Sequence, residues 1–362
     1  MSAGKTWFSH RRSDMATKIV LFDTKQYDEE FFTRTNATFG FDIKYLPNKL
    51  TPDTVRLAEG AEVVCAFVND TLNREVIEQL YAYGVKLIAL RCAGYNNVDL
   101  RIIYGKIHVV RVPAYSPHAV AEHAIALMMS LNRKTHRAYY RVRDNNFAIH
   151  GFIGFDMYGK TAGVIGTGKI GKAAIDILNG FGMKIVAYDP YPDAMYADEK
   201  GIRYGSLDEL YAVSDIITLH CPLSPQNVHM INSESIAVMK DGVMIINTGR
   251  GKLIDTKSLI NGLKSGKIGS AGLDVYEEET DYFFEDYSSS AINDDVLARL
   301  ITFPNVLITS HQGFLTAEAL GAIARTTLEN VRLFFEKGEL PNEICYKCCE
   351  NTCSKKETGR CF

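Results

Sequence analysis

Residues 161–172 have the sequence Thr-Ala-Gly-Val-Ile-Gly-Thr-Gly-Lys-Ile-Gly-Lys, and this stretch decides the fold. It begins as a short apolar strand, continues through a glycine-rich turn and leads into a helical pattern over residues 170–178. A second apolar strand over residues 183–189 ends on Asp189. A strand, a glycine turn, a helix and a second strand that ends on an acid form the layout of a dinucleotide-binding site.

Each glycine of the turn has a separate physical task. Gly166 allows the tight turn, Gly168 lets the backbone approach a pyrophosphate, and Gly171 lets the helix pack closely on the strand. The free N–H groups at the helix N-terminus favour negative charge, so the phosphates are expected there. Asp189 is expected to bind the ribose hydroxyls, and no basic residue stands beside it. The pattern therefore favours NAD over NADP, whose 2′-phosphate would meet a carboxylate.

The size and composition of the chain fit a globular enzyme of two domains. A chain of 362 residues is too long for one ordinary core. The net charge of −3 gives no reason to expect nucleic acid or an anionic membrane as partner. No apolar run approaches the roughly 18 to 20 residues that a membrane span needs.

Strand-like runs alternate with helical patterns on both sides of the glycine turn, which predicts parallel sheets with helices on both faces. Helices are expected over residues 117–132, where Ser116 and Pro117 suit a helix start, and over residues 317–337. The sequence thus predicts an α/β protein with two doubly wound domains. The other expected strands cover residues 18–23, 62–67, 86–90, 108–112, 216–220, 242–247, 269–274 and 306–310.

Three residues that follow predicted strands could together assist a nicotinamide cofactor in reducing a keto acid. Arg250 lies between two glycines, and its planar guanidinium suits bidentate carboxylate binding. His311 is the candidate acid/base, and Glu279 is the carboxylate expected to favour its imidazolium form. Ligands of open α/β sheets bind beyond the carboxyl ends of the strands, so all three are placed for a site. Each residue alone has a structural explanation, and their combination carries the prediction.

These residues give the chain a resemblance to a known family. Arg250, Glu279 and His311, in this order after the glycine turn, resemble the D-isomer-specific 2-hydroxyacid dehydrogenases. The similarity covers about residues 17–345 and is strongest to the lactate-forming members. It includes four further motifs, which are Arg-Cys-Ala-Gly-Tyr-Asn-Asn-Val-Asp-Leu at 91–100, Val-Pro-Ala-Tyr-Ser-Pro at 112–117, Val-Ala-Glu-His-Ala at 120–124 and His-Gln-Gly-Phe-Leu-Thr-Ala-Glu at 311–318.

The resemblance implies a cytoplasmic fermentation enzyme that reduces pyruvate to D-lactate with NADH and assembles as a homodimer or homotetramer. Arg250 would bind the substrate carboxylate with the backbone amides of Ala93 and Gly94, and Tyr115 would contact the substrate. His311 would donate the proton. The residues implied to bind NAD are Gly166, Gly168, Lys169, Ile170, Gly171, Asp189, Cys221, Pro222, Asn227, Thr248, Gly249, Arg250 and Asp274.

The resemblance also implies a division into domains with a cleft that closes on the ligands. Residues 117–312 would form a Rossmann NAD-binding domain, and residues 17–116 with 313–345 a discontinuous, flavodoxin-like substrate domain. The connecting helix before His108 is one residue shorter than usual, and Gly313 replaces a common alanine. Two other functions remain open, which are a dehydrogenase for another D-2-hydroxyacid and an NAD-sensing interaction protein.

The two ends of the chain lie outside the resemblance. Residues 1–16 are expected to be a disordered extension, although a weak targeting segment is an alternative. Five of the eight cysteines lie in the last eighteen residues. Cys345 and Cys348 have the spacing of a zinc half-site, but no second pair and no nearby histidine completes it. Residues 346–362 are therefore expected to form a mobile tail with exposed thiols, and no metal site is predicted.

Overall fold

The computed structural model describes residues 16–279, 282–349, 352–353 and 355–362. The contacts divide the chain into two compact units. Unit 1 is Met1–Tyr115 with Ala317–Phe362, and unit 2 is Ser116–Thr316. The division falls beside the expected domain boundaries, except that residues 346–362 belong to unit 1. Of the expected extension, only Ala16 is among the described residues.

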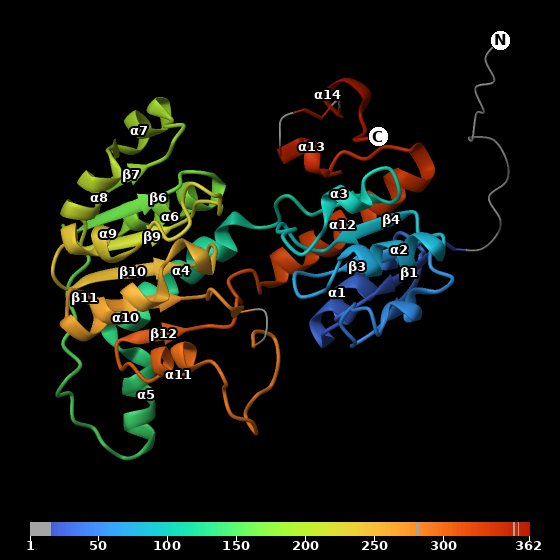
Figure 1. Cartoon of the computed structure of the whole chain (residues 1–362). Helices are drawn as coiled ribbons and strands as arrows, with labels where there is room; N and C mark the ends of the chain where they lie inside the picture. Colours follow the sequence, from blue (N-terminus) through green and yellow to red (C-terminus); the bar gives the residue numbers. More distant parts are fainter. Residues whose placement is uncertain (1–15, 280–281, 350–351, 354) are drawn as a thin grey trace, which may run out of the picture. The chain divides into compact units, whose positions relative to one another are not determined.

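Unit 1 contains, in its described part, a five-stranded parallel sheet of order β2-β1-β3-β4-β5 (Figure 1). This is the strand order of flavodoxin-like folds. The inner strands β3 and β4 are buried along their whole length, as expected for strands covered on both faces. The elements are β1 (Lys18–Leu21), α1 (Gln26–Asn36), β2 (Asp42–Tyr45), η1 (Val55–Ala58), β3 (Val63–Ala66), α2 (Arg74–Ala82), β4 (Leu87–Leu90), α3 (Leu100–Ile103), β5 (His108–Val110), α12 (Ala317–Lys337), α13 (Tyr346–Cys349) and α14 (Lys355–Thr358).

Unit 2 contains, in its described part, a seven-stranded parallel sheet of order β12-β11-β10-β9-β6-β7-β8. The elements are α4 (Pro117–Arg133), α5 (Thr135–Arg143), β6 (Thr161–Ile165), α6 (Lys169–Gly180), β7 (Lys184–Tyr188), α7 (Ala194–Lys200), β8 (Arg203–Tyr204), α8 (Leu207–Val213), β9 (Ile216–Leu219), α9 (Ser233–Val238), β10 (Val243–Asn247), η2 (Gly251–Leu253), α10 (Thr256–Ser265), β11 (Ile268–Leu273), α11 (Asp295–Ile301) and β12 (Val306–Ile308).

Two apolar clusters cover the faces of the unit 2 sheet. Leu127 of α4 and Leu178 of α6 belong to one cluster, while Leu259 of α10 and Leu300 of α11 belong to the other. The strand order reverses between β6 and β9, so the loops after these strands diverge there. This switch point is where open α/β sheets bind ligands.

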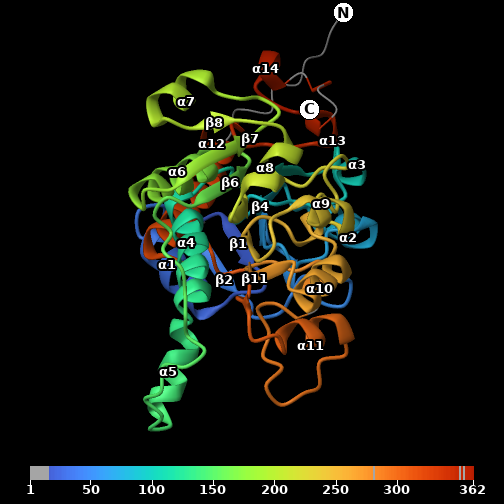
Figure 2. The same ribbon diagram turned by 90° about the vertical axis from the view of Figure 1, so that its left-hand side faces the viewer.

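The predicted elements are confirmed, and α12 has its predicted bounds. The start of α4 follows the sequence, because Ser116 accepts a hydrogen bond from the Ala119 N–H and Pro117 occupies the first turn. Sequence reasoning missed β2, β8 and α5. In Figures 1 and 2, α5 extends from α4 away from the sheet of unit 2.

The expected mobile tail is wrong in one respect. Cys345 and Cys361 are only 2% exposed, because the described parts of the C-terminal segment pack within unit 1. None of the described helices combines the length and hydropathy needed to cross a lipid bilayer.

Candidate active site

The glycine turn lies between β6 and α6 and touches the loop after β9. Gly166 has a φ of 92°, and a Cβ added there would lie 2.7 Å from the Cys221 nitrogen. A Cβ on Gly171 would lie 2.0 Å from the Gly166 oxygen, so the helix can approach the turn only without a side chain. These two glycines therefore have steric reasons that the sequence predicted.

Gly168 is different, because a Cβ there would meet nothing within 4 Å. It is the N-cap of α6 and offers no side chain to the free N–H groups of the first turn. An open space before uncapped N–H groups fits a diphosphate. Lys169 and Ile170 form the first turn of this helix.

Asp189 follows β7 and is fixed beside the turn. Its Oδ2 accepts hydrogen bonds from the Thr167 N–H at 2.7 Å and the Thr167 hydroxyl at 3.1 Å. Its Oδ1 accepts from the Tyr191 N–H at 2.9 Å. Oδ1 has a second lone pair, so the side chain can still accept a ribose hydroxyl. Sequence reasoning missed Thr167, although it lies within the quoted glycine stretch.

The loop after β9 contains the other residues expected on the adenosine side. Asn227 holds this loop, because its Nδ2 donates to the Pro222 oxygen at 2.8 Å and its Oδ1 accepts from the Ser224 N–H at 2.7 Å. Burial raises the pKa of the Cys221 thiol to about 11, so this thiol is neutral at physiological pH. Burial likewise lowers the pKa of His220 to about 4, which keeps its ring neutral beside the glycine turn.

Arg250 lies in the loop after β10, which Asn247 organises. Asn247 is 1% exposed; its Nδ2 donates to the Arg250 oxygen at 2.9 Å and its Oδ1 accepts from the Gly249 N–H at 3.0 Å. A Cβ on Gly251 would lie 2.0 Å from the Tyr276 oxygen, so a glycine is required beside the arginine. Thr248 Oγ1 is buried and has no hydrogen-bond partner within the described residues. A buried hydroxyl without a partner fits a ligand contact.

His311 and Glu279 form the pair that the sequence predicted. The His311 Nδ1 and the Glu279 Oε1 are 2.9 Å apart, and each side chain is about one-fifth exposed (21% and 22%). The second oxygen of Glu279 accepts from the Tyr276 N–H at 2.9 Å, which fixes the carboxylate. With Nδ1 facing Glu279, Nε2 is the ring nitrogen left to exchange a proton with a substrate.

Asp274 holds the backbone on which His311 lies. Its Oδ1 accepts from the Gln312 N–H at 2.8 Å and the Thr309 hydroxyl at 2.6 Å, while its Oδ2 accepts from the Gly313 N–H at 2.8 Å. His123 of α4 lies 3.2 Å from the same carboxylate. Burial alone would raise the pKa of Asp274, but the bonds from His123 and Thr309 lower it overall. Asp274 is therefore an ionised structural support at the end of β11.

The three candidate active-site residues lie at one edge of the sheet. Arg250, Glu279 and His311 follow β10, β11 and β12, which are neighbouring parallel strands. Their carboxyl ends meet at the edge that also carries the glycine turn. Asn247, His123 and Thr309 were missed as supports, although His123 lies in a quoted motif. Their role depends on contacts between distant segments, which spacing alone does not reveal.

Ala93, Gly94 and Tyr115 belong to unit 1. The loop after β4 is firmly held, because the Arg111 guanidinium donates to the Ala93 oxygen at 2.8 Å. The buried Arg91 anchors the same loop through its ion pair with Asp28, 3.3 Å apart. Their contact with substrate stays a prediction.

Comparisons with known proteins agree with this geometry. A sequence model described as "D-isomer specific 2-hydroxyacid dehydrogenase, NAD binding domain" matches residues 125–313. The D-lactate dehydrogenase of Escherichia coli (strain K12) is 55% identical over 329 residues, which cover 90% of this chain and 99% of the relative. Its apo structure aligns with a TM-score of 0.84 and 53% identity, and covers 91% of this chain and 100% of that chain.

A second structure extends the likeness beyond bacteria. The structure reported for the pyruvate reductase of Chlamydomonas reinhardtii aligns with a TM-score of 0.86 and 45% identity, and covers 90% of this chain and 98% of that chain. The glycine turn, the Arg-Glu-His set and these matches lead to one conclusion. The chain belongs to the D-isomer-specific 2-hydroxyacid dehydrogenases and contains their NAD-binding domain.

Proposed function

We propose that this chain is an NAD-dependent D-lactate dehydrogenase that interconverts pyruvate and D-lactate. The single observation that supports this most strongly is the 2.9 Å pair of His311 and Glu279 at the sheet edge that carries Arg250 and the glycine turn. The identity of 55% to the D-lactate dehydrogenase of Escherichia coli supports the choice of substrate.

The residues divide the chemistry among them. When bound, NADH supplies the hydride that reduces the carbonyl carbon. Arg250 binds the substrate carboxylate as a planar, permanently charged donor. His311 holds a proton at Nε2 and gives it to the carbonyl oxygen as that oxygen becomes negative. Glu279 favours the charged imidazolium, so a proton is available in the reducing direction.

Residues of unit 1 complete the proposal. We assign part of the binding of the substrate carboxylate to the amides of Ala93 and Gly94, and a substrate contact to Tyr115. Their support is the resemblance of the segments 91–100 and 112–117 to the family. Replacing Tyr115 with Phe is expected to raise the KM for the keto acid and leave NADH binding unchanged.

We further propose a cytoplasmic homo-oligomer with a role in fermentation. The buried thiol of Cys65, which forms no disulfide, suits a reducing compartment. For the oligomer, the support is a run of exposed apolar side chains on α5 and in the segment after it. These are Tyr139, Tyr140, Val142, Phe147, Ile149 and Ile153, which are 50% to 89% exposed.

Steady-state oxidation of NADH with a panel of keto acids tests the proposal. Pyruvate should give the highest kcat/KM, ahead of glyoxylate and of branched or aromatic keto acids, and NADPH should be a poor replacement for NADH. A clear preference for a bulky keto acid would identify a different D-2-hydroxyacid dehydrogenase. Tight NADH binding with no turnover on any keto acid would instead indicate an NAD-sensing protein.

A further inference from the structure

Four cysteines of the C-terminal segment bring their sulfur atoms together. Cys345, Cys348, Cys353 and Cys361 have sulfurs that all lie within 4.8 Å of one another. The separations include 3.6 Å between Cys345 and Cys348, 3.7 Å between Cys345 and Cys353, and 3.6 Å between Cys348 and Cys361. A disulfide needs about 2.0 Å, so none of these three pairs is bonded.

These separations match tetrahedral coordination of one ion. Four thiolates about 2.3 Å from a central Zn²⁺ lie about 3.8 Å apart along each edge of the tetrahedron. We propose that Cys345, Cys348, Cys353 and Cys361 bind one structural Zn²⁺ ion. The quartet leaves room for one ion and not for the several iron and sulfide atoms of a cluster. The second pair of ligands that the sequence spacing lacked is supplied by the fold.

Short local elements bring the four ligands together. Cys345 directly precedes α13 and Cys348 lies within it, with the Cys348 N–H donating to the Cys345 oxygen at 3.1 Å. Cys353 follows this helix, and Cys361 follows α14. Cys345 and Cys361 are buried and the other two are partly buried. All four coordination positions are filled by protein, as in structural rather than catalytic zinc sites.

Glu343 fastens this segment to the edge strand β5. One of its oxygens lies 2.5 Å from the His108 Nδ1, and the other accepts from the Cys361 N–H at 2.5 Å. An antiparallel bridge joins Glu343 to Val110, and the Tyr104 hydroxyl donates to the Cys361 oxygen at 3.1 Å. Cys361 is therefore tied to the sheet. The metal would link the cysteines that lie between Glu343 and the end of the segment at Cys361.

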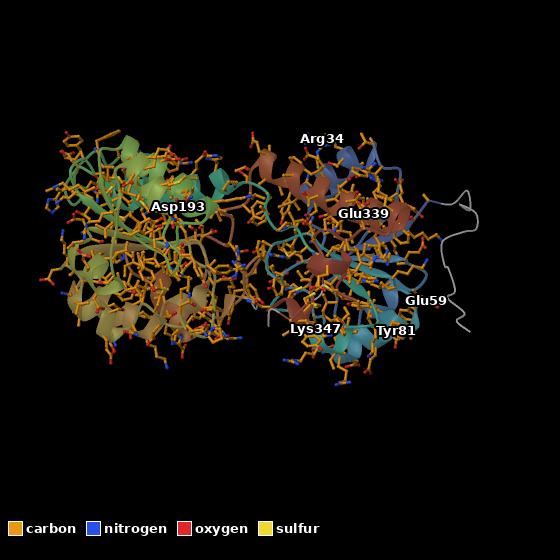
Figure 3. All side chains as sticks on the ribbon, turned by 90° about the horizontal axis from the view of Figure 1, so that it is seen from above. Arg34, Glu59, Tyr81, Asp193, Glu339 and Lys347 are labelled. Carbon is orange, nitrogen blue, oxygen red and sulfur yellow. The ribbon has the colours of Figure 1, made fainter. Side chains whose placement is uncertain are left out.

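The stacking of aromatic rings adds to the same attachment. The rings of His108 and Phe362 stack with centroids 4.4 Å apart, and Tyr104 meets Phe362 edge-on at 5.0 Å. Lys347, which Figure 3 labels on the red C-terminal segment, donates to the Tyr104 hydroxyl at 3.0 Å. These contacts cover the open edge of the sheet, which an unpaired strand would otherwise expose.

The composition of the segment explains why a metal is needed. Apart from its cysteines, the stretch 345–362 contains only Tyr346 and Phe362 as large apolar residues. So little apolar area cannot offset the entropy of ordering this stretch, whereas zinc binding supplies folding free energy directly. Four thiolates and one Zn²⁺ carry a net charge of −2. Lys347, Lys355 and Arg360 in the same segment offset that charge.

The first experiment measures metal content in the full-length chain. Protein produced with added zinc and purified under reducing conditions should contain one zinc per chain by inductively coupled plasma mass spectrometry. Cys348→Ser and Cys353→Ser should each lose most of it. Cys349→Ser is the matched control in the same helix and should keep its zinc, because four other cysteines already complete the coordination. Replacing zinc with Co²⁺ should give the visible absorption of a tetrahedral cobalt–thiolate site.

The second experiment tests the structural role by limited trypsin digestion. Removal of zinc with a chelator should speed cleavage after Lys347, Lys355 and Arg360, and added zinc should reverse the effect. Cys348→Ser should be cleaved fast with or without the chelator. Turnover of NADH by Cys348→Ser or Cys353→Ser is a separate readout, because the proposed acid/base pair lies in unit 2. A failed keto-acid assay would therefore leave the zinc proposal intact.

Several results would overturn the zinc site. A full-length chain with no more zinc than Cys348→Ser would do so, and so would intact disulfides among the four cysteines in the native protein. One iron and no zinc per chain would contradict the choice of metal. Equal loss of zinc in Cys349→Ser would contradict the set of four ligands.

Discussion

His311 has a φ of 48°, which lies in the left-handed region of backbone conformation. Few residues other than glycine adopt this conformation. Hydrogen bonds to Asp274 keep His311 in this conformation. The His311 N–H donates to the Asp274 backbone oxygen at 2.8 Å, and the N–H groups of Gln312 and Gly313 donate to the Asp274 carboxylate. Strained residues that the surroundings hold in place are frequent at functional sites. At the residue scale, the fold therefore keeps an unfavourable backbone conformation that positions the imidazole ring of His311.

Replacing His311 with Gln should remove the proton donor and keep the shape of the site. We expect turnover with pyruvate to fall about 10²- to 10⁴-fold, which is the usual contribution of a general acid. NADH affinity, measured by fluorescence titration, should change little. The exposed His150→Gln is the matched control and should keep normal turnover. Near-normal turnover in His311→Gln would exclude the acid role.

Replacing Glu279 with Gln should change the pH dependence rather than abolish activity. The carboxylate lies 2.9 Å from the His311 Nδ1, and its negative charge favours the protonated ring. Without that charge, the protonated ring loses the anion nearest to it. The pH at which pyruvate reduction falls by half should therefore move to lower values. A kcat/KM profile that does not move would count against the pairing.

Asp274 is the third residue whose charge can be tested. Asp274→Asn replaces an acceptor oxygen with an amide that cannot accept the amide donors around it, and we expect a loss of about 1–3 kcal/mol in the free energy of unfolding at neutral pH. Because the folded-state pKa of Asp274 is lowered, this contribution is present above the ordinary aspartate pKa of about 3.9. It is lost as the pH falls through the folded-state value.

Urea unfolding at several pH values measures the effect of Asp274→Asn. The difference from the unchanged chain should be largest near pH 7 and should shrink below about pH 4. A difference that stays constant across this range would show that the charge of Asp274 does not stabilise the fold.

At the scale of elements, the glycine turn depends on two contacts that exclude a side chain. Gly171→Ala would place a methyl group 2.0 Å from the Gly166 oxygen, so α6 must move away from the turn. NADH binding should weaken by at least about tenfold, which corresponds to about 1.4 kcal/mol. Gly180→Ala lies in the same helix, meets nothing within 4 Å, and should bind NADH normally. Equal affinities in the two variants would contradict the role of the turn.

Some of the helices and strands could be predicted from the sequence and others could not. Most of the parallel strands and α12 were predictable because their apolar residues follow a clear pattern, and the capping by Ser116 marked the start of α4. The two-residue strand β8 and the half-buried strand β2 carry too weak a pattern. Helix α5 has no buried residue, so its sequence has no apolar stripe from which the helix could be predicted.

At the scale of the whole chain, the catalytic pair was predictable and its supports were not. His311 and Glu279 follow predicted strands, so their proximity follows from the sheet order. The contact of His123 with Asp274 joins α4 to the end of β11, and the sulfurs of Cys345, Cys348, Cys353 and Cys361 meet only in the folded chain. Such contacts depend on how distant segments pack, which local sequence patterns do not contain.

The proposed oligomer is also tested at this scale. Exposed aromatic residues on α5 and beyond, including Tyr140 at 68% and Phe147 at 73%, would be buried by a partner subunit. The double change Tyr140→Glu with Phe147→Glu should lower the mass measured by sedimentation while circular dichroism stays unchanged. Met195→Glu, which lies at another exposed site, is the control. A parent chain that sediments as a monomer would exclude the oligomer.

The identity of the product tests the proposed reaction most directly. The purified chain is incubated with pyruvate and NADH, and the lactate is resolved by chiral chromatography while NADH loss is followed by absorbance. We expect one D-lactate for each NADH oxidised, and formation of D-lactate at least about 100-fold slower in His311→Gln. Formation of L-lactate, or oxidation of NADH without lactate, would contradict the proposed reaction.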